Sequence, residues 1–139
     1  MRNTDTSATS KELYPYILFQ PYSCKITFGK DIVRSLGFPT HVCLRINEST
    51  NSVAVMPCKP EDVMSFKVPE NLFTDHHSVF RISSKSFIFN LLMKYDLDPT
   101  YNYEYKGIYS EKLKAVIFSL AEENKTIKEV RTVLKDSQQ

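Results

Sequence analysis

Two stretches of the chain, about 23–58 and 79–120, follow the same order of strand, helix, strand, polar turn and strand. In each stretch a short apolar strand leads into a segment whose apolar residues recur every three or four positions, which is typical of a helix with one buried face. Pro39 and Pro99 interrupt the two helical segments, and strands with alternating apolar residues follow. One unit of this kind cannot bury its apolar face alone, so we expect two divergent copies to complete one core between them.

The helix of the first copy is followed by a glycine, a residue type that suits a helix end. Gly37 follows the apolar residues of the helix, and glycine adopts the left-handed conformation of a helix end without a steric penalty from a Cβ atom. A polar turn then separates two alternating segments. The predicted elements are a strand at 25–28, a helix at 30–36, and a hairpin of strands at 41–46 and 53–56.

The second copy has a longer helix and a strand rich in tyrosine. Ile88, Leu91, Leu92 and Tyr95 recur at helical spacing, and we expect them to face the core. The predicted elements are a strand at 79–83, a helix at 85–94, a strand at 101–105, a turn at 106–112 and a strand at 113–120.

The segments outside the two copies complete the predicted fold. Thr126 and Glu129 have the spacing of a capping box, which indicates a helix start. We therefore expect an α+β protein, a β-rich barrel from two tandem strand-helix-strand-strand repeats with a short C-terminal helix. Its expected parts are a disordered leader at 1–12, a single domain at 13–120, and the C-terminal helix and tail at 121–139. Within the domain, we expect an extended edge segment at 14–22 and a surface linker at 57–77.

The composition argues against several classes of protein. No apolar run approaches the roughly 20 residues of a membrane-spanning helix. Cys24, Cys43 and Cys58 are odd in number and too widely spaced for a CxxC motif, so we expect free, packed thiols and a cytoplasmic location. No serine lies in a nucleophile motif such as GxSxG, and the adjacent His76 and His77 would point to opposite sides of an extended chain. We expect no enzymatic activity, no metal and no cofactor.

The first copy resembles the swapped-hairpin unit of the AbrB and SpoVT family of bacterial transcription regulators. The resemblance is carried by Lys25–Gly37, which includes a short helix ending in Leu-Gly, and by the hairpin from Val42 to Met56. The tandem arrangement of two units is similar to that of the MraZ regulators. The resemblance implies a DNA-binding regulator, expected as a homodimer, with Arg34 and Arg45 at positions that contact DNA.

Basic residues fall at corresponding places in the two copies, although the formal net charge is only +2. Folding the copies about a pseudo-two-fold axis would gather these residues into one face able to bind a duplex phosphate backbone. The alternative is that the charges only keep the domain in solution, because acidic residues such as Asp31 and Glu104 lie among them. The predicted DNA-binding residues are Lys25, Lys30, Arg34, Arg45, Arg81 and Lys85.

Tyrosines crowd the predicted hairpin of the second copy. Tyrosine offers a large rigid contact area, so these residues could form a protein-binding surface. They could instead be strand residues that pack across the sheet, which the preference of aromatic residues for strands favours. The alternative function is therefore a non-enzymatic adaptor or inhibitor, such as one encoded by a mobile element, that binds a protein partner through Tyr101, Tyr103, Tyr105 and Tyr109.

Overall fold

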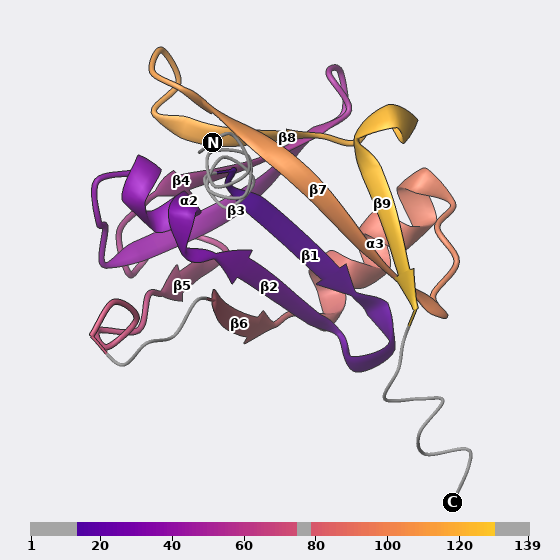
Figure 1. Ribbon diagram of the computed structural model, residues 1–139, viewed down its shortest axis with the longest axis horizontal. Helices are drawn as coiled ribbons and strands as arrows, with labels where there is room; N and C mark the ends of the chain where they lie inside the picture. The colour runs from indigo at the N-terminus through magenta and orange to yellow at the C-terminus, as the bar shows by residue number, and fades with distance from the viewer. Residues whose placement is uncertain (1–13, 75–78, 130–139) are drawn as a thin grey trace, which may run out of the picture.

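The computed structural model describes residues 14–74 and 79–129, which form a strand-rich, nearly closed antiparallel barrel (Figure 1). The strands follow the order β5-β3-β4-β8-β7-β1-β2-β6, and β9 pairs with β7. The strands are β1 (Tyr16–Gln20), β2 (Lys25–Gly29), β3 (His41–Asn47), β4 (Ser52–Pro57), β5 (Ser65–Lys67), β6 (Val79–Ser83), β7 (Tyr101–Ser110), β8 (Ala115–Ser119) and β9 (Lys125–Glu129). The helices are α2 (Lys30–Ser35), α3 (Lys85–Tyr95) and the short 3-10 helices η1 (Pro21–Ser23) and η2 (Glu122–Asn124).

Strand β7 connects the two halves of the barrel. Its first part pairs with β1 and β9, and its last four residues pair with β8. The change of partner occurs at Gly107, where an added Cβ atom would lie 2.5 Å from Cε2 of Phe118. A glycine is therefore needed where β7 passes closely over the core.

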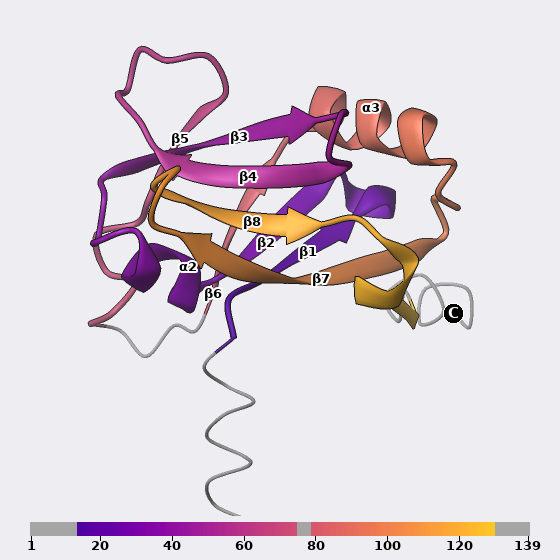
Figure 2. The same ribbon diagram turned by 90° about the horizontal axis from the view of Figure 1, so that it is seen from above.

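Two strand pairs lie on opposite sides of the barrel. Strands β7 and β1 separate the β4–β8 pair from the β2–β6 pair in one direction around the barrel, and β3 and β5 separate them in the other. Figure 2 shows β4 and β8 in front, with neither α2 nor α3 covering them. Figures 1 and 2 place α2 and α3 at opposite ends of the barrel. The outer surfaces of both strand pairs are thus left uncovered by these helices.

The core joins residues from both predicted copies. The rings of Phe28 and Phe80 lie directly opposite each other and stack, with centroids 4.8 Å apart. Phe19 packs edge-on against Tyr105 at 5.9 Å between ring centroids. These aromatic contacts link β1, β2, β6 and β7, so burial of aromatic area holds distant parts of the chain together.

Both predicted helices are confirmed, together with the turn that ends the first one. The amide of Phe38 donates to the carbonyl of Val33 at 2.9 Å, and the amide of Gly37 donates to that of Arg34 at 3.1 Å. Gly37 has a φ of +81°, as expected for the left-handed residue of this motif. The strand predicted at 79–83 is β6, and the helix predicted at 85–94 extends by one residue to Tyr95.

Three predictions are wrong: one before the first copy, one between the two copies and one in the second hairpin. Residues 14–22 are not an edge segment, because β1 lies inside the sheet and pairs with both β2 and β7. Residues 106–112 are not one turn, because β7 continues to Ser110. The stretch 57–77 is not only a linker, because it contains β5, which pairs with β3.

The predicted C-terminal helix is also wrong where the structure describes it. Residues 125–129 form strand β9, in which Ile127 lies opposite Tyr103 of β7. The ladder to β7 satisfies the backbone of this segment, which overrides the local capping-box pattern. The leader predicted at 1–12 and the tail at 130–139 lie outside the described residues, as do His76 and His77. Among the residues described, no helix is both long and apolar enough to cross a membrane.

Candidate nucleic-acid interface

The outer surface of the β2–β6 pair carries two basic residues that contact the opposite strand in the same way. We call this surface, formed by the exposed side chains of Lys25, Arg81 and Ser83 around the buried Thr27, the β2–β6 face. Nζ of Lys25 donates to the hydroxyl of Ser83 at 3.3 Å, and Nε of Arg81 donates to the hydroxyl of Thr27 at 3.2 Å. Each cation is thus held by a hydroxyl group across the ladder.

The two contacts are centred on one residue pair. Ile26 lies directly opposite Ile82, with Lys25 opposite Ser83 and Thr27 opposite Arg81. Each cation therefore precedes an isoleucine of the central pair, and each hydroxyl follows one. Within the described part of the chain, no acidic side chain forms an ion pair with Lys25 or Arg81, so both keep their charge available to a ligand.

Lys85 lies beside this face. The amide of Ser84 donates to the carbonyl of Cys24 at 3.0 Å, which joins the end of β6 to the residue before Lys25. The Ser84 hydroxyl accepts a hydrogen bond from the amide of Phe87 at 3.3 Å and caps α3. Lys85 is the first residue of this helix, and it is exposed. Of the six predicted basic residues, Lys25 and Arg81 thus share the β2–β6 face, and Lys85 follows Ser83 of that face by two residues.

Lys30 and Arg34 belong to a different cluster. Both lie on α2, with Nζ of Lys30 at 5.4 Å and Cζ of Arg34 at 5.2 Å from the ring centroid of Phe73. Arg34 also forms an ion pair with Asp31 at 2.6 Å. Lys30 follows Gly29, at the opposite end of β2 from Lys25. Lys30 and Arg34 thus lie next to Phe73 at the far end of β2 from Lys25, and their contact with DNA stays a prediction.

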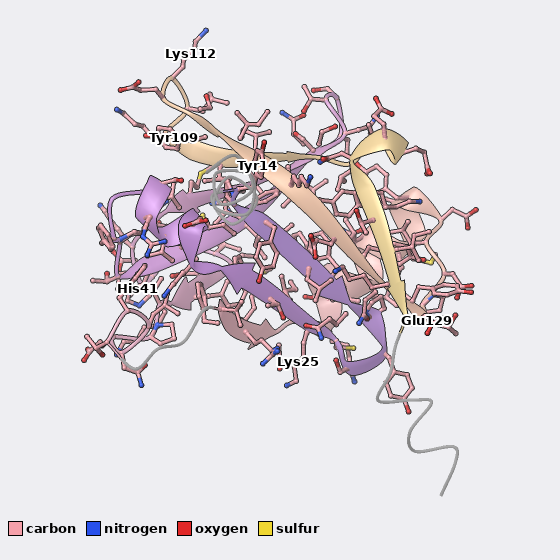
Figure 3. The ribbon with its side chains drawn as sticks, viewed as in Figure 1. Tyr14, Lys25, His41, Tyr109, Lys112 and Glu129 are labelled. Carbon is pink, nitrogen blue, oxygen red and sulfur yellow. The ribbon has the colours of Figure 1, made fainter. Side chains whose placement is uncertain are left out.

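Arg45 lies on β3, one of the two strands that separate the β4–β8 pair from the β2–β6 pair. It is exposed on β3 opposite Ala54 of β4, and Nη1 donates to the carbonyl of Val63 at 3.2 Å. Strand β5 lies between β3 and the β2–β6 pair, and Figure 3 shows Lys25 at the lower edge of the molecule, away from Tyr109 and Lys112 of the β7–β8 hairpin. Arg45 is thus also separate from the β2–β6 face.

The predicted tyrosine surface is wrong for its two central members. Tyr103 and Tyr105 are 2% and 1% exposed and point into the core. The Tyr103 hydroxyl donates to the carbonyl of Asp98 at 2.7 Å, and burial raises the pKa of Tyr105 well above its ordinary value. Tyr101 and Tyr109 are 41% and 37% exposed, but they lie near opposite ends of β7 and do not form one patch.

Cys24, Cys43 and Cys58 are free thiols, as the sequence predicts. Burial, with a smaller effect of the neighbouring Cys58 thiol, raises the pKa of the Cys43 thiol to about 11. Such a thiol is protonated at neutral pH and is a poor nucleophile or metal ligand. In the parts of the chain that the structure describes, no three His, Cys, Asp or Glu side chains gather as metal ligands would.

Sequence reasoning missed an apolar surface on the outside of the β4–β8 pair. Ile108 is 77% exposed and Leu113 is 60% exposed, and both flank this surface. Ile108 was hidden in the segment expected to be a turn. In β8, Ala115 and Ile117 alternate with Val116 and Phe118, which fill the core side. Because both sets are apolar, the sequence did contain a signal for a second, outward apolar side.

Comparison with known proteins gives no relative for this chain. No family model, curated protein or solved structure matches it.

Proposed function

We propose that the protein is a non-enzymatic, cytoplasmic DNA-binding regulator of the swapped-hairpin type, which binds duplex DNA through Lys25, Arg81 and Lys85. The observation that carries the proposal is the pair of matching cation–hydroxyl contacts on the β2–β6 face. Exposed cations without acidic partners can replace the counterions of a phosphate backbone, and the release of those counterions favours binding.

Likenesses between the two halves of the chain support this proposal. The order β2-α2-β3-β4 is followed by β6-α3-β7-β8, and Ile26 of the first set pairs with Ile82 of the second. Both hairpins have four residues between their last paired positions, and the last of these, Asn51 or Lys114, has a φ of +50° or +54°. Common turn geometry at corresponding positions is what two diverged copies of one unit would retain.

The proposed two-fold relation between β2 and β6 also fits the symmetry of duplex DNA. A duplex has its own approximate two-fold axes, and proteins with two-fold symmetry use them to place equivalent groups on the two strands. An axis through Ile26 and Ile82 would relate Lys25 to Arg81 and present one cation to each strand. Phosphate contacts of this kind position a protein on the duplex without specifying its sequence.

Binding of mixed-sequence duplex DNA, followed by fluorescence anisotropy, tests this proposal. We expect the wild-type chain to bind at about 50 mM salt, where backbone electrostatics are strong. Replacing Lys25 and Arg81 by Ala should weaken binding and reduce the slope of log K against log salt by about 2, because each phosphate contact contributes about 0.9. A wild-type chain that does not bind at this salt concentration refutes the proposal.

A matched variant controls for net charge. Lys59 and Lys112 are exposed and lie in loops away from the β2–β6 face, so replacing both by Ala removes the same charge. This variant should keep the wild-type salt slope. Equal weakening in the two double variants would mean that only overall charge attracts DNA and that the β2–β6 face has no role.

The second candidate function is a protein-binding adaptor or inhibitor. The observation that favours it is the exposed apolar group on the β7–β8 hairpin, which includes Ile108, Tyr109 and Leu113. Of the tyrosines predicted for this function, Tyr101 and Tyr109 retain exposed rings. Protein binding without any DNA binding at low salt would favour this function over the first.

A further inference from the structure

The outer surface of the β4–β8 pair is an apolar face that none of the described helices covers. A cross-strand row runs from Arg45 through Ala54 and Ile117 to Ile108, as the register of β3, β4, β8 and β7 shows. Figure 2 displays β4 and β8 without a helix in front of them. We call the outward side chains of this row and their neighbours the β4–β8 face.

The β4–β8 face is shaped as a ridge between two hollows. Ile117 and Ser119 border both hollows, whose volumes are about 490 Å³ and 470 Å³. The first hollow extends to Arg45, Met56 and Leu113. The second extends to Ile108 and Glu123. Apolar atoms supply most of the exposed surface in both hollows, so a complementary apolar surface would gain free energy by entering them.

The charges at the two ends of the face are opposite. Arg45 borders the first hollow and Glu123 borders the second, and neither forms an ion pair with another described residue. Lys106, the other charged residue of the second hollow, lies over the Tyr14 ring with Nζ 5.2 Å from the centroid. A surface with an apolar centre, a cation at one end and an anion at the other is complementary to itself after a two-fold rotation.

We propose that the β4–β8 face binds a second copy of this chain. A two-fold axis near Ile117 would bring Arg45 of each copy to Glu123 of the other and would place the exposed Ile108 side chains against the apolar centre. Two-fold contacts use the same patch on both subunits, which is the property this charge pattern has. The β2–β6 face lies on the other side of the barrel and stays exposed in such a dimer.

Sedimentation equilibrium across a wide concentration series measures whether the dimer forms. The wild-type chain should reach twice the 16.1 kDa mass of one chain. Ile108→Lys should shift the mass to that of one chain, because it places a charge in the apolar contact. Ile108 is 77% exposed, so this change should leave the thermal unfolding midpoint nearly unchanged. Met93→Lys on α3, where the residue is 70% exposed, is the matched control and should remain dimeric.

Charge reversal identifies the orientation of the two copies. Arg45→Glu and Glu123→Arg should each weaken the dimer, because each places like charges opposite one another. The double variant should restore the wild-type dissociation constant, which a loss of folding could not do. A wild-type chain that remains monomeric overturns the proposal, as does a foreign protein occupying the face of a monomer. A dimer that resists Ile108→Lys, or that the double variant does not restore, overturns it as well.

The dimer test and the DNA test have separate outcomes. Lys25→Ala with Arg81→Ala should leave the mass unchanged, since these residues lie on the opposite side of the barrel. Ile108→Lys should leave the contacts of the β2–β6 face with DNA in place. Failure of one proposal is therefore distinguishable from failure of the other.

Discussion

Ile26 lies directly opposite Ile82 in the antiparallel β2–β6 pair and is fully buried. This contact joins residues that are far apart in sequence, and Phe28 and Phe80 extend it by stacking two positions away. The β2–β6 pair is thus a place where the early and late parts of the chain depend on each other for burial.

Truncation of Ile26 should therefore destabilise the whole fold. We expect Ile26→Ala to lower the free energy of unfolding by about 2 to 5 kcal/mol, because it leaves a cavity at a fully buried site. Urea unfolding followed by circular dichroism measures the change. Met93→Ala, at a residue 70% exposed, should alter the same quantity by no more than about 0.5 kcal/mol. Equal effects of the two substitutions would contradict this view of the core.

Gly107 should tolerate no larger residue. The Cβ atom of Gly107→Ala would lie 2.5 Å from Cε2 of Phe118 and 2.8 Å from Cγ1 of Val116, so we expect a loss of about 1 to 3 kcal/mol in unfolding free energy. Adding Phe118→Leu should make room for the methyl group, so the two changes together should cost less than the sum of the single changes. A double-mutant cycle in urea measures this coupling, and strict additivity would argue against the close approach.

The cap of α3 should contribute measurably to stability. The Ser84 hydroxyl accepts a hydrogen bond from the amide of Phe87 at 3.3 Å, so Ser84→Ala should lower the unfolding free energy by about 1 kcal/mol. Ser86→Ala changes the same side chain inside the helix, where alanine is favourable, and should not destabilise. The difference between the two thermal unfolding midpoints is the result to examine. If the two variants have the same midpoint, the Ser84 hydroxyl does not cap the helix.

Stability should fall at alkaline pH in part because of Cys43. Burial raises the pKa of this thiol from 9.0 to about 11, so the unfolded chain loses the proton at lower pH than the folded chain. The folded state then binds more protons between these values, and the free energy of unfolding decreases as pH rises from about 9 to about 11. Cys43→Ala should show a shallower decrease in urea titrations over this range. Tyr105, whose pKa burial also raises, is retained in both proteins and does not affect the comparison.

Local patterns were sufficient to predict the elements that depend on local interactions. Gly37 follows α2 in the left-handed conformation that the sequence predicts, and Ile88 and Leu91 of α3 are buried, as their helical spacing predicts. Both signals act within a few residues, so they can be read without knowledge of the tertiary structure. The strand β6 was predicted from the apolar residues that precede α3.

Other elements depend on partners that local patterns do not reveal. Thr126 and Glu129 have helix-start spacing, yet pairing with β7 makes their segment a strand. The placement of the basic residues on the barrel could not be predicted for the same reason. Arg45 and Arg81 both lie on strands, but the side of the barrel that each occupies follows from the full strand order. The apolar side of β8 that faces outward was overlooked for this reason.

If the chain both dimerises and binds DNA as proposed, the opposite placement of the β2–β6 and β4–β8 pairs around the barrel determines how the dimer would meet the duplex. Two chains joined back to back through β4–β8 would turn their cationic sides in opposite directions. Such a pair would not read neighbouring half-sites along one helix. It would instead tether two separate stretches of double helix, so binding of the dimer would loop or cross-link DNA.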